Sequence, residues 1–222
     1  MEPASIQTLE YYPFQVKGYQ NTYPKRRIAV IPTLDQRDFR DSAGVGHASY
    51  RGHPAIGVIL DQSGKIDQRL YGPALEPLVQ NAIARAAQEA GMIPSTSGLS
   101  LQQALAGRNA DYVLEASIKR CWVNKHRGPD NQAGVTWAAA ADVALDVSIY
   151  KPPFQVAFWQ GESVSNYNDP PLPAAGATSE DGTEIYDQPG QVLSVALTRA
   201  IAGIFKRDSL HVLIVQDSPP AH

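Results

Sequence analysis

The residues that could do chemistry in this sequence gather in one aperiodic segment, residues 33–55. His47 and His53 share this segment with three aspartates, namely Asp35, Asp38 and Asp41. Imidazole and carboxylate groups can hold a metal ion, so a hydrolase site in this loop is one hypothesis. The spacing matches no standard metal site, however, and no supporting hydrogen-bond partner can be assigned. Solvated loop histidines are the simpler interpretation.

The other candidate groups do not form a catalytic arrangement. Cys121, the single cysteine, lies on a predicted strand, whereas reactive thiols favour helix N-termini or basic neighbours, so we expect an inert, half-buried thiol. Asp142 and Asp146 are four residues apart on another strand, ~13 Å, which is too far to act on one bond. No P-loop or nucleophile elbow is present. The sequence therefore predicts a non-enzymatic protein with no catalytic residue, cofactor or metal.

Composition limits the class of protein further. The 222 residues carry a net charge of -3 and no long basic run, so nucleic acid is not expected as a partner. No apolar stretch is long enough for a transmembrane helix. One cysteine excludes an intrachain disulfide. The start, MEPASIQTLEYYPFQ, has no signal-peptide pattern, so we expect a cytoplasmic protein if Met1 is the native start, or a signal segment removed upstream.

Hydrophobic periods divide the chain into a Tyr-rich N-terminal arm over 1–25, a single domain over 26–216 and a tail over 217–222. Two long loops are expected inside the domain, at 33–55 and 168–190. The expected elements, in order, are a strand over 26–32, a hairpin over 56–71, a helix over 74–90, a short strand at 92–93, a short helix over 100–107, a meander over 111–167, a helix over 190–207 and a closing strand over 210–216.

The meander begins with NADYVLEASIKRCWV, residues 109–123, which alternates with a period of two. One predicted face holds Tyr112, Leu114, Ala116, Ile118 and Trp122. The other face holds Glu115, Ser117, Lys119 and Cys121. The segment KHRGPDNQAG, 125–134, is expected to be the loop that leads into the next strand.

These periods predict an α+β fold, an α/β sandwich. Each strand of the meander offers one apolar face, and the two longer helices each carry one apolar stripe. The economical arrangement is a mostly antiparallel sheet with both amphipathic helices packed on one face.

The arm carries aromatic residues without a sustained period. It either lies on its own domain or reaches a neighbouring protein. Because aromatic side chains are frequent interface anchors, we hypothesise that the arm is a partner-binding surface made of Tyr11, Tyr12, Phe14, Tyr19 and Tyr23.

A second hypothesis is a small-ligand or lipid carrier with a pocket between the sheet and the helices. Three tryptophans could line such a pocket, namely Trp122, Trp137 and Trp159. Tryptophans that simply fill the core are the alternative.

The order of elements resembles the YajG-like envelope lipoproteins of Gram-negative bacteria. More loosely, it resembles the sheet-plus-helix domains of the TolB N-terminal and curli-secretion lipoprotein class. The resemblance covers residues 26–207 and rests on RIAVIP, IGVILDQSGKID, a helix that ends in glycine, ADYVLEASIKRCWV and FQVAFWQGE. Its motifs are structural.

The resemblance implies a periplasmic protein anchored to the outer membrane by a lipid upstream of residue 1. It implies an accessory or assembly role, with other envelope proteins in a larger membrane complex as partners, and no catalytic residues. The sequence departs from the pattern in two ways, since it has no lipobox cysteine at its start and its two loops are long.

Overall fold

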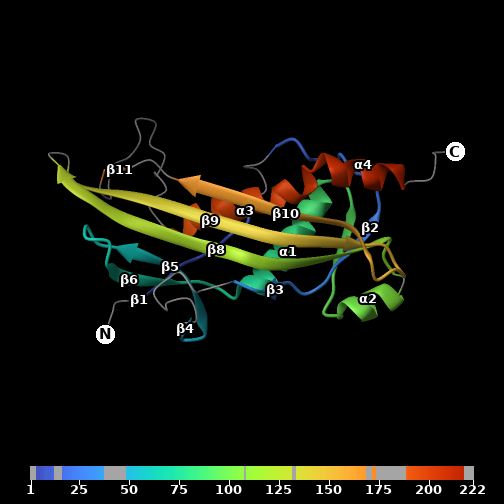
Figure 1. Cartoon of the computed structure of the whole chain (residues 1–222), viewed down its shortest axis with the longest axis horizontal. Helices are drawn as coiled ribbons and strands as arrows, with labels where there is room; N and C mark the ends of the chain where they lie inside the picture. Colours follow the sequence, from blue (N-terminus) through green and yellow to red (C-terminus); the bar gives the residue numbers. More distant parts are fainter. Residues whose placement is uncertain are drawn as a thin grey trace.

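A computed structural model describes residues 4–12, 17–37, 49–107, 109–131, 134–168, 172–173 and 189–217. Its centre is a three-stranded antiparallel meander of β8 (Tyr112–Asn131), β9 (Gly134–Tyr150) and β10 (Ala157–Asn168), green to orange in Figure 1. This confirms the meander predicted over 111–167. Residues 125–131, predicted as loop, continue the ladder of β8 with β9 instead, as far as the pair of Asn131 with Gly134.

Shorter strands extend the sheet from the other edge of β8. Three of them pair with β8 in succession, each in parallel: β2 (Arg27–Val30), β3 (Leu34–Asp35) and β5 (His53–Leu60). The remaining strands are β6 (Ile66–Tyr71), antiparallel to β5; β1 (Ala4–Ile6), parallel to β6; β7 (Ile93–Thr96), parallel to β2; β4 (Ser49–Tyr50), beside β5; and β11 (Leu172–Pro173), beside β9. The predicted hairpin over 56–71 is confirmed as β5 and β6.

The sheet is therefore mixed, and the prediction of a mostly antiparallel sheet was wrong. Alternation along a strand reports which face each side chain occupies, but it does not report the direction of the neighbouring strand. Here β7 and β8 are joined through a helix and run parallel on either side of β2, as helix-containing crossovers allow. The α+β class itself holds.

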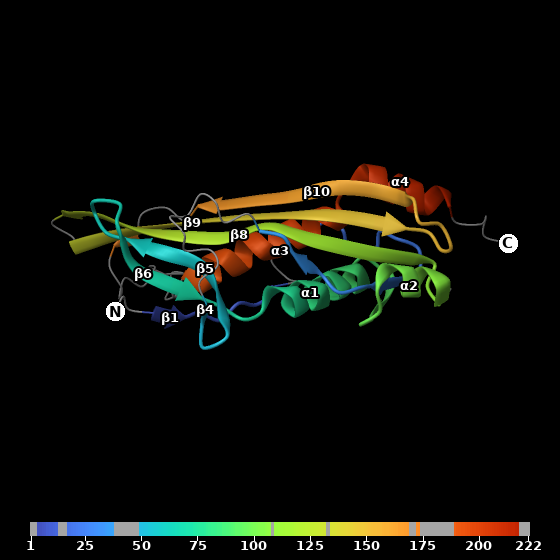
Figure 2. The ribbon, with the colours of Figure 1, turned by 60° about the horizontal axis from the view of Figure 1, so that its bottom comes forward.

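Two helices, α1 (Leu75–Glu89) and α3 (Pro189–Phe205), pack on the same face of the sheet, as predicted. Figure 2 shows both of them beneath the long strands. The apolar stripe of α1 includes Val79, Ile83 and Ala86, which are fully buried. Gly91 follows this helix with φ +103°, and a Cβ there would lie 2.8 Å from the carbonyl oxygen of Tyr23, so only glycine fits.

The short helix α2 (Leu101–Gly107) covers the opposite face at one end of the sheet. Its Leu105 is buried against Val113 and Tyr150. The predicted capping box is confirmed, because the Ser100 backbone N–H donates to Gln103 Oε1 (3.0 Å) and the Gln103 N–H donates to Ser100 Oγ (3.4 Å).

The last described element is a helix, α4 (Asp208–Gln216), where the sequence predicts a closing strand over 210–216. A short apolar run fits either element, and length alone does not decide between them. Leu210 and Ile214 are fully buried at a spacing of four, while Val212 and Val215 are 47% and 44% exposed. The segment therefore follows a helical period.

A β-bulge between Ile118 and Arg120 reverses the faces of β8 partway along its length. Cys121 and Val123 are consequently buried on the helix side, together with Ile118. Trp122 lies on the other face, so its predicted placement beside Ile118 was wrong. An extra residue in a bulge moves every later side chain to the opposite face.

The two predicted loops and the tail lie partly outside the described residues. The described ends of 33–55 form β3, β4 and the start of β5, while 38–48 are not described. In 168–190 the structure describes β11 and the start of α3. Of the tail it describes only Asp217. No helix in the described ranges has the length and apolar character needed to cross a bilayer.

Candidate functional site

Residues 4–12, named here the N-terminal strap, run from β6 across α3. The backbone N–H groups of Glu10 and Tyr12 donate to the hydroxyls of Ser194 and Thr198, each at 3.0 Å. Both hydroxyl residues are fully buried and lie one turn apart on α3. An extended segment advances about two residues per helical turn, so this spacing matches the strap to the helix.

Three tyrosines of the arm belong to the core of the chain's own domain. Tyr11, Tyr19 and Tyr23 are 7%, 1% and 5% exposed. The Tyr11 and Tyr19 hydroxyls lie 2.9 Å apart, and both hydrogen-bond to the Glu89 carboxylate at the end of α1. The Tyr23 hydroxyl donates to the carbonyl oxygen of Phe205 at 3.0 Å.

Burial and these contacts keep the phenols protonated. Burial is the main cause that raises the pKa of Tyr11 to about 12, and the neighbouring Glu89 carboxylate adds to it. The pKa of Tyr19 is raised further, by burial and by its hydrogen bond to Glu89.

The structure places most of the residues of the hypothesised aromatic partner surface. As folded, Tyr11, Tyr19 and Tyr23 are covered by the chain itself and present no surface to a partner. Tyr12 is half-buried, and Phe14 lies outside the described residues. A signal for this burial is present in the sequence, since Leu9 and Tyr11 alternate with the polar Thr8 and Glu10, as in a strand with one buried face.

The proposed metal or hydrolase loop is only partly described. His53 lies on β5, where its Nδ1 is 3.1 Å from the Gly72 carbonyl oxygen. Among the described residues no group of three or more histidine, cysteine, aspartate or glutamate side chains could hold a metal ion. His47, Asp38 and Asp41 lie outside the described residues.

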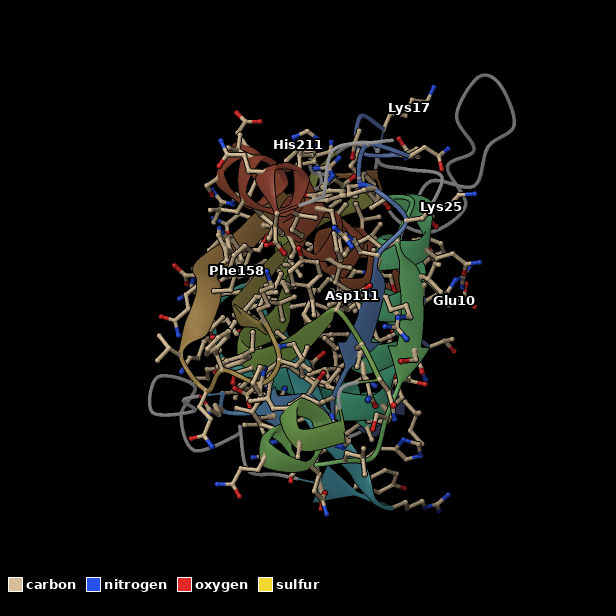
Figure 3. All side chains as sticks on the ribbon, turned by 90° about the vertical axis from the view of Figure 1, so that its right-hand side faces the viewer. Glu10, Lys17, Lys25, Asp111, Phe158 and His211 are labelled. Carbon is tan, nitrogen blue, oxygen red and sulfur yellow. The ribbon has the colours of Figure 1, made fainter. Side chains whose placement is uncertain are left out.

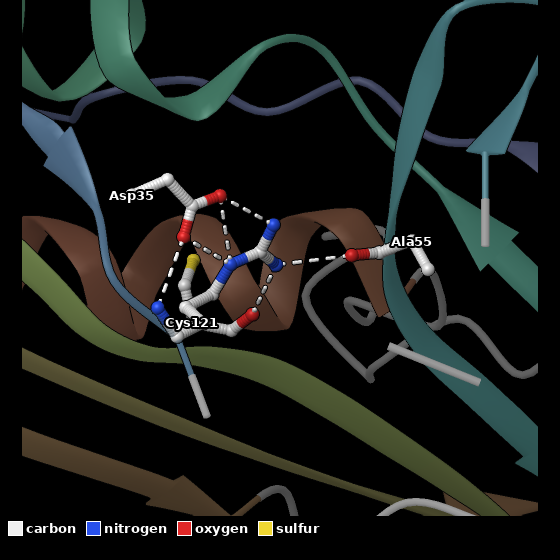
Figure 4. Close-up of polar contacts among 4 residues, drawn as sticks. Asp35, Ala55 and Cys121 are labelled. Atoms are coloured by element: carbon white, nitrogen blue, oxygen red, sulfur yellow. Dashed lines mark hydrogen bonds and ion pairs between the residues drawn. The ribbon is translucent and has the colours of Figure 1, made fainter. Parts of the chain in front are cut away.

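Asp35 instead pairs with Arg37, whose side chain is only 4% exposed. The guanidinium donates from Nε to Asp35 Oδ1 (2.9 Å) and from Nη2 to Asp35 Oδ2 (2.8 Å). Its Nη1 also donates to the carbonyl oxygens of Ala55 (3.0 Å) and Cys121 (3.4 Å), as Figure 4 shows. Arg37 thus bridges β5 and β8 where β8 has left β3 and has not yet met β5. Sequence reasoning missed this residue, because nothing local marks a charge that will be buried.

Trp122 and Trp159 lie on opposite faces of the sheet, and Cys121 lies on the same side as Trp159. Cys121 is fully buried, and burial raises the pKa of its thiol to about 12, which makes it inert. Trp122, on the outer face, donates from its indole to Asn124 Oδ1 at 2.9 Å. Trp159, on the helix side, donates to Ser209 Oγ at 3.0 Å. These two tryptophans cannot line one carrier pocket together, and the side chain of Trp137 lies outside the described residues.

A charged cleft of about 450 Å³ opens at the end of the sheet where β2 and β8 begin and β9 ends. It is lined by Arg26, Arg27, Ala110, Asp111, Lys151, Pro152, Pro153 and Asp217. Asp217 Oδ2 accepts from the Tyr112 hydroxyl (2.6 Å), and its Oδ1 pairs with Lys151. Partial burial opposes ionisation of Asp217, but these partners hold its pKa below the usual range. Arg26 and Arg27 come from the start of β2, and nothing in the sequence links them to Lys151 and Asp217.

Strand β10 forms a long edge of the sheet. Within the described part of the chain it pairs only with β9, along twelve residues. Its residues on the helix side include Ser163, whose hydroxyl donates to the Ala200 carbonyl oxygen of α3. Val164, on the other side, is 42% exposed.

The outer face of the meander carries charge pairs between strands. Lys119 bridges to Asp146 at 3.4 Å, and Arg120 bridges to Asp142 at 2.7 Å. Both aspartates are at least 42% exposed, so they are charges on the solvated side of the sheet and not a catalytic pair, as the sequence predicts.

Comparison with known proteins defines the class of fold. No family model matches the chain, and no curated protein matches it. Among solved structures, protein XCC0632 from Xanthomonas campestris, of the DUF330 family, superposes with a TM-score of 0.51 at 11% identity, covering 96% of this chain and 98% of that one. At this identity the likeness shows a shared fold alone.

Two further structural likenesses are weaker, with TM-scores below 0.5. A putative neuraminyllactose-binding hemagglutinin homolog from Helicobacter pylori gives a TM-score of 0.45 at 11% identity, covering 93% of this chain and 96% of that one. Lipoprotein GNA1162 from Neisseria meningitidis gives 0.28 at 11% identity, covering 71% and 89%.

Proposed function

We propose that this chain is a non-enzymatic protein of the bacterial cell envelope that acts as an accessory subunit or assembly factor by binding another protein. The observation that carries this proposal is the open edge of β10. Natural proteins usually shorten, twist or cover such an edge, because its free N–H and C=O groups accept a further strand. The described part of the chain gives the twelve residues of β10 one neighbouring strand, and such an edge suits a partner that adds a strand.

The geometry of the edge identifies which residues a partner would meet. The Arg207 guanidinium donates to the Glu162 carbonyl oxygen at 2.6 Å, so this carbonyl points away from β9. Since the N–H and C=O of one residue in an antiparallel strand point to the same side, Val164 and Asn166 direct their backbone groups to the open edge as well. Arg207 covers one end of the edge, and the stretch from Val164 onward offers the contact.

A photo-cross-linking amino acid in place of Val164, in the native envelope, tests the proposal. A discrete adduct with one other protein is expected. Val212 on α4 is the matched control, because it is exposed to a similar extent (47% against 42%) but belongs to a helix, which cannot pair with an added strand. Equal adducts at both positions, or none at Val164, would contradict the proposal, and an adduct containing only this chain would replace the accessory role with self-association.

Proline substitution separates the edge from the ladder. Val164→Pro removes an N–H that faces the edge and leaves the hydrogen bonds to β9 intact, so we expect little change in thermal unfolding. It should abolish the adduct formed by a probe at Asn166. Ser165→Pro, one residue on, removes an N–H that faces β9 and should unfold the edge. A Val164→Pro protein that keeps its adduct would show that the partner does not add a strand.

Anchorage to the outer membrane, through a lipid upstream of residue 1, forms a separate part of the proposal. It rests on the resemblance to the YajG-like lipoproteins. The test is the mass of the N-terminus of the native protein, taken from membrane fractions of its host. A lipid-modified cysteine ahead of this segment is expected, and an unmodified Met1 on a soluble protein would reject the anchor and favour the cytoplasm.

A further inference from the structure

The charged cleft carries more positive than negative charge. Arg26, Arg27 and Lys151 face two carboxylates, Asp111 and Asp217. Arg27 binds Asp111 through its backbone N–H (2.8 Å) and its guanidinium (3.4 Å), and Lys151 pairs with Asp217. These contacts neutralise both carboxylates and leave one cation in excess.

The excess cation is Arg26, which directly precedes β2. Its guanidinium donates to the backbone carbonyl oxygen of Asp217 at 3.2 Å, and no carboxylate of the described residues lies within ion-pair distance of it. A guanidinium has five N–H donors, so most of those on Arg26 remain available to an anion. The neighbouring Lys25 is exposed and adds positive charge beside the cleft. Figure 3 looks onto this end, with Asp111 near the centre and Lys25 to its right.

Exposed apolar side chains lie on two elements that border the same cleft. Phe154 and Val156 are 63% and 82% exposed on the turn that follows Lys151, and the Phe154 N–H donates to the Lys151 carbonyl oxygen at 2.9 Å. Ile93, 52% exposed, pairs with Arg27 across β7 and β2. The turn thus begins at one cation of the cleft, Lys151, and Ile93 is the register partner of another, Arg27. They come from two elements, the turn after β9 and strand β7, and are called here the apolar rim of the cleft.

We propose that this end of the molecule, the basic cleft with its apolar rim, binds the surface of a membrane that contains anionic phospholipid. Guanidinium and ammonium groups are suited to phosphate oxygens, which accept charge-assisted hydrogen bonds. Apolar side chains beside the cations enter the boundary between headgroups and acyl chains, which a phosphate free in solution does not offer. The chain as a whole is negative, so the attraction is a property of this end and not of the net charge.

The cleft and the β10 edge occupy different parts of the molecule. The cleft lies at the end where α4 finishes, whereas β1 lies at the other end in both Figure 1 and Figure 2. The open edge of β10 runs between the two ends. Membrane contact through the cleft therefore leaves that edge accessible, and the two proposals do not depend on each other.

Sedimentation with vesicles tests the proposal. The full chain is expected to bind vesicles that mix phosphatidylglycerol with phosphatidylcholine, to bind pure phosphatidylcholine weakly, and to dissociate in high salt, where the Debye length falls from ~8 Å to ~3 Å. Arg26→Gln with Arg27→Gln should weaken binding by about 25-fold, at roughly fivefold per cation. The control pair, Arg51→Gln with Lys65→Gln, removes the same charge from exposed positions in the half that carries β1 and should bind as the natural chain does.

The apolar rim gives a second, independent variant. Phe154→Ser with Val156→Ser alters two exposed side chains and should leave thermal unfolding unchanged while it weakens vesicle binding. Failure of the natural chain to bind anionic vesicles would overturn the proposal, as would equal losses in the control pair. Release by millimolar inorganic phosphate, combined with full binding by the serine variant, would assign the cleft to a free anion instead. A cross-link from position 154 to a protein, without vesicle binding, would reject the lipid as well.

Discussion

The two faces of the β8–β10 meander share one backbone and differ in chemistry. Toward α1 and α3 the strands present Ile118, Leu145 and their neighbours, which are fully buried. Away from the helices the same strands present the ion pairs of Lys119 and Arg120, and of the described elements α2 covers one end of this face. The helix side therefore supplies the stability of the fold. As far as the described residues go, most of the outer side and the edge of β10 from Val164 onward are available for contacts.

The largest expected effect comes from opening the helix side. Leu145→Ala removes a side chain with no exposure, opposite Ile118 on β8, and leaves a cavity among packed residues. We expect a loss of ~2–5 kcal/mol in the free energy of unfolding, measured by urea denaturation. Asp146→Asn, the next residue on the same strand, is the control for the outer face and should cost less than ~1 kcal/mol. Equal losses at the two positions would erase the distinction between the faces.

An effect of similar size is expected at Arg37, a buried charge that is an exception to this division between an apolar face and a charged face. Arg37→Met keeps the aliphatic length but leaves the Asp35 carboxylate and the carbonyls of Ala55 and Cys121 without their donor. Removing one partner of a buried pair costs ~3 kcal/mol or more. Arg207→Met is the control, since its exposed guanidinium also bonds a strand carbonyl, and it should cost under ~1 kcal/mol. A mild effect of Arg37→Met would mean that water replaces the guanidinium.

Local patterns in the sequence were sufficient to predict the helices that cover the sheet. The stripe of α1, the capping box before α2 and the hairpin of β5 with β6 all depend on residues a few positions apart. The direction of β2 beside β8 and the bulge after Ile118 depend on partners that are distant in sequence. A single extra residue in β8 places Trp122 on the outer face, and the hydrophobic period within the strand does not predict this bulge.

The candidate sites were less predictable than the fold. Aromatic residues in the arm pointed to a contact surface, yet Tyr11 and Tyr19 are buried because α1 supplies Glu89 as a shared hydrogen-bond partner. The cleft combines Arg26 with Lys151 and Asp217 from three distant segments. Only the fold brings such groups together, so composition and spacing could not identify them.

The strap should respond to alkaline pH. The pKa of Tyr11 is about 12 in the folded chain against the ordinary value of 10.0, so its contribution to stability is complete below pH 10 and is lost as the pH rises toward 12. We expect the free energy of unfolding to fall across that interval. Tyr11→Phe should make the fall of the unfolding free energy with pH less steep, by at most about 1.4 kcal/mol per pH unit, the value for one proton.

Urea denaturation at a series of pH values measures this slope. Tyr50→Phe is the control, because Tyr50 is half-exposed on β4 and lies outside the strap. The two variants should differ only above pH 10 in the pH dependence of stability. A Tyr11→Phe slope equal to that of the natural chain would place the Tyr11 phenol in water and loosen the strap from α1.

The smallest effect is expected from the outer-face ion pair of Lys119 and Asp146. Its side chains are 38% and 50% exposed, with 3.4 Å between Nζ and Oδ2, so water and salt screen the attraction. A double-mutant cycle of Lys119→Ala and Asp146→Ala should give a coupling of ~0.2–1 kcal/mol that shrinks in high salt. Glu162 lies directly opposite Asp146 on β10, and its repulsion lowers the benefit of the pair further. A coupling well above 1 kcal/mol would show that this face is desolvated, as it would be beneath a covering layer, and that it contributes to the fold as the helix side does.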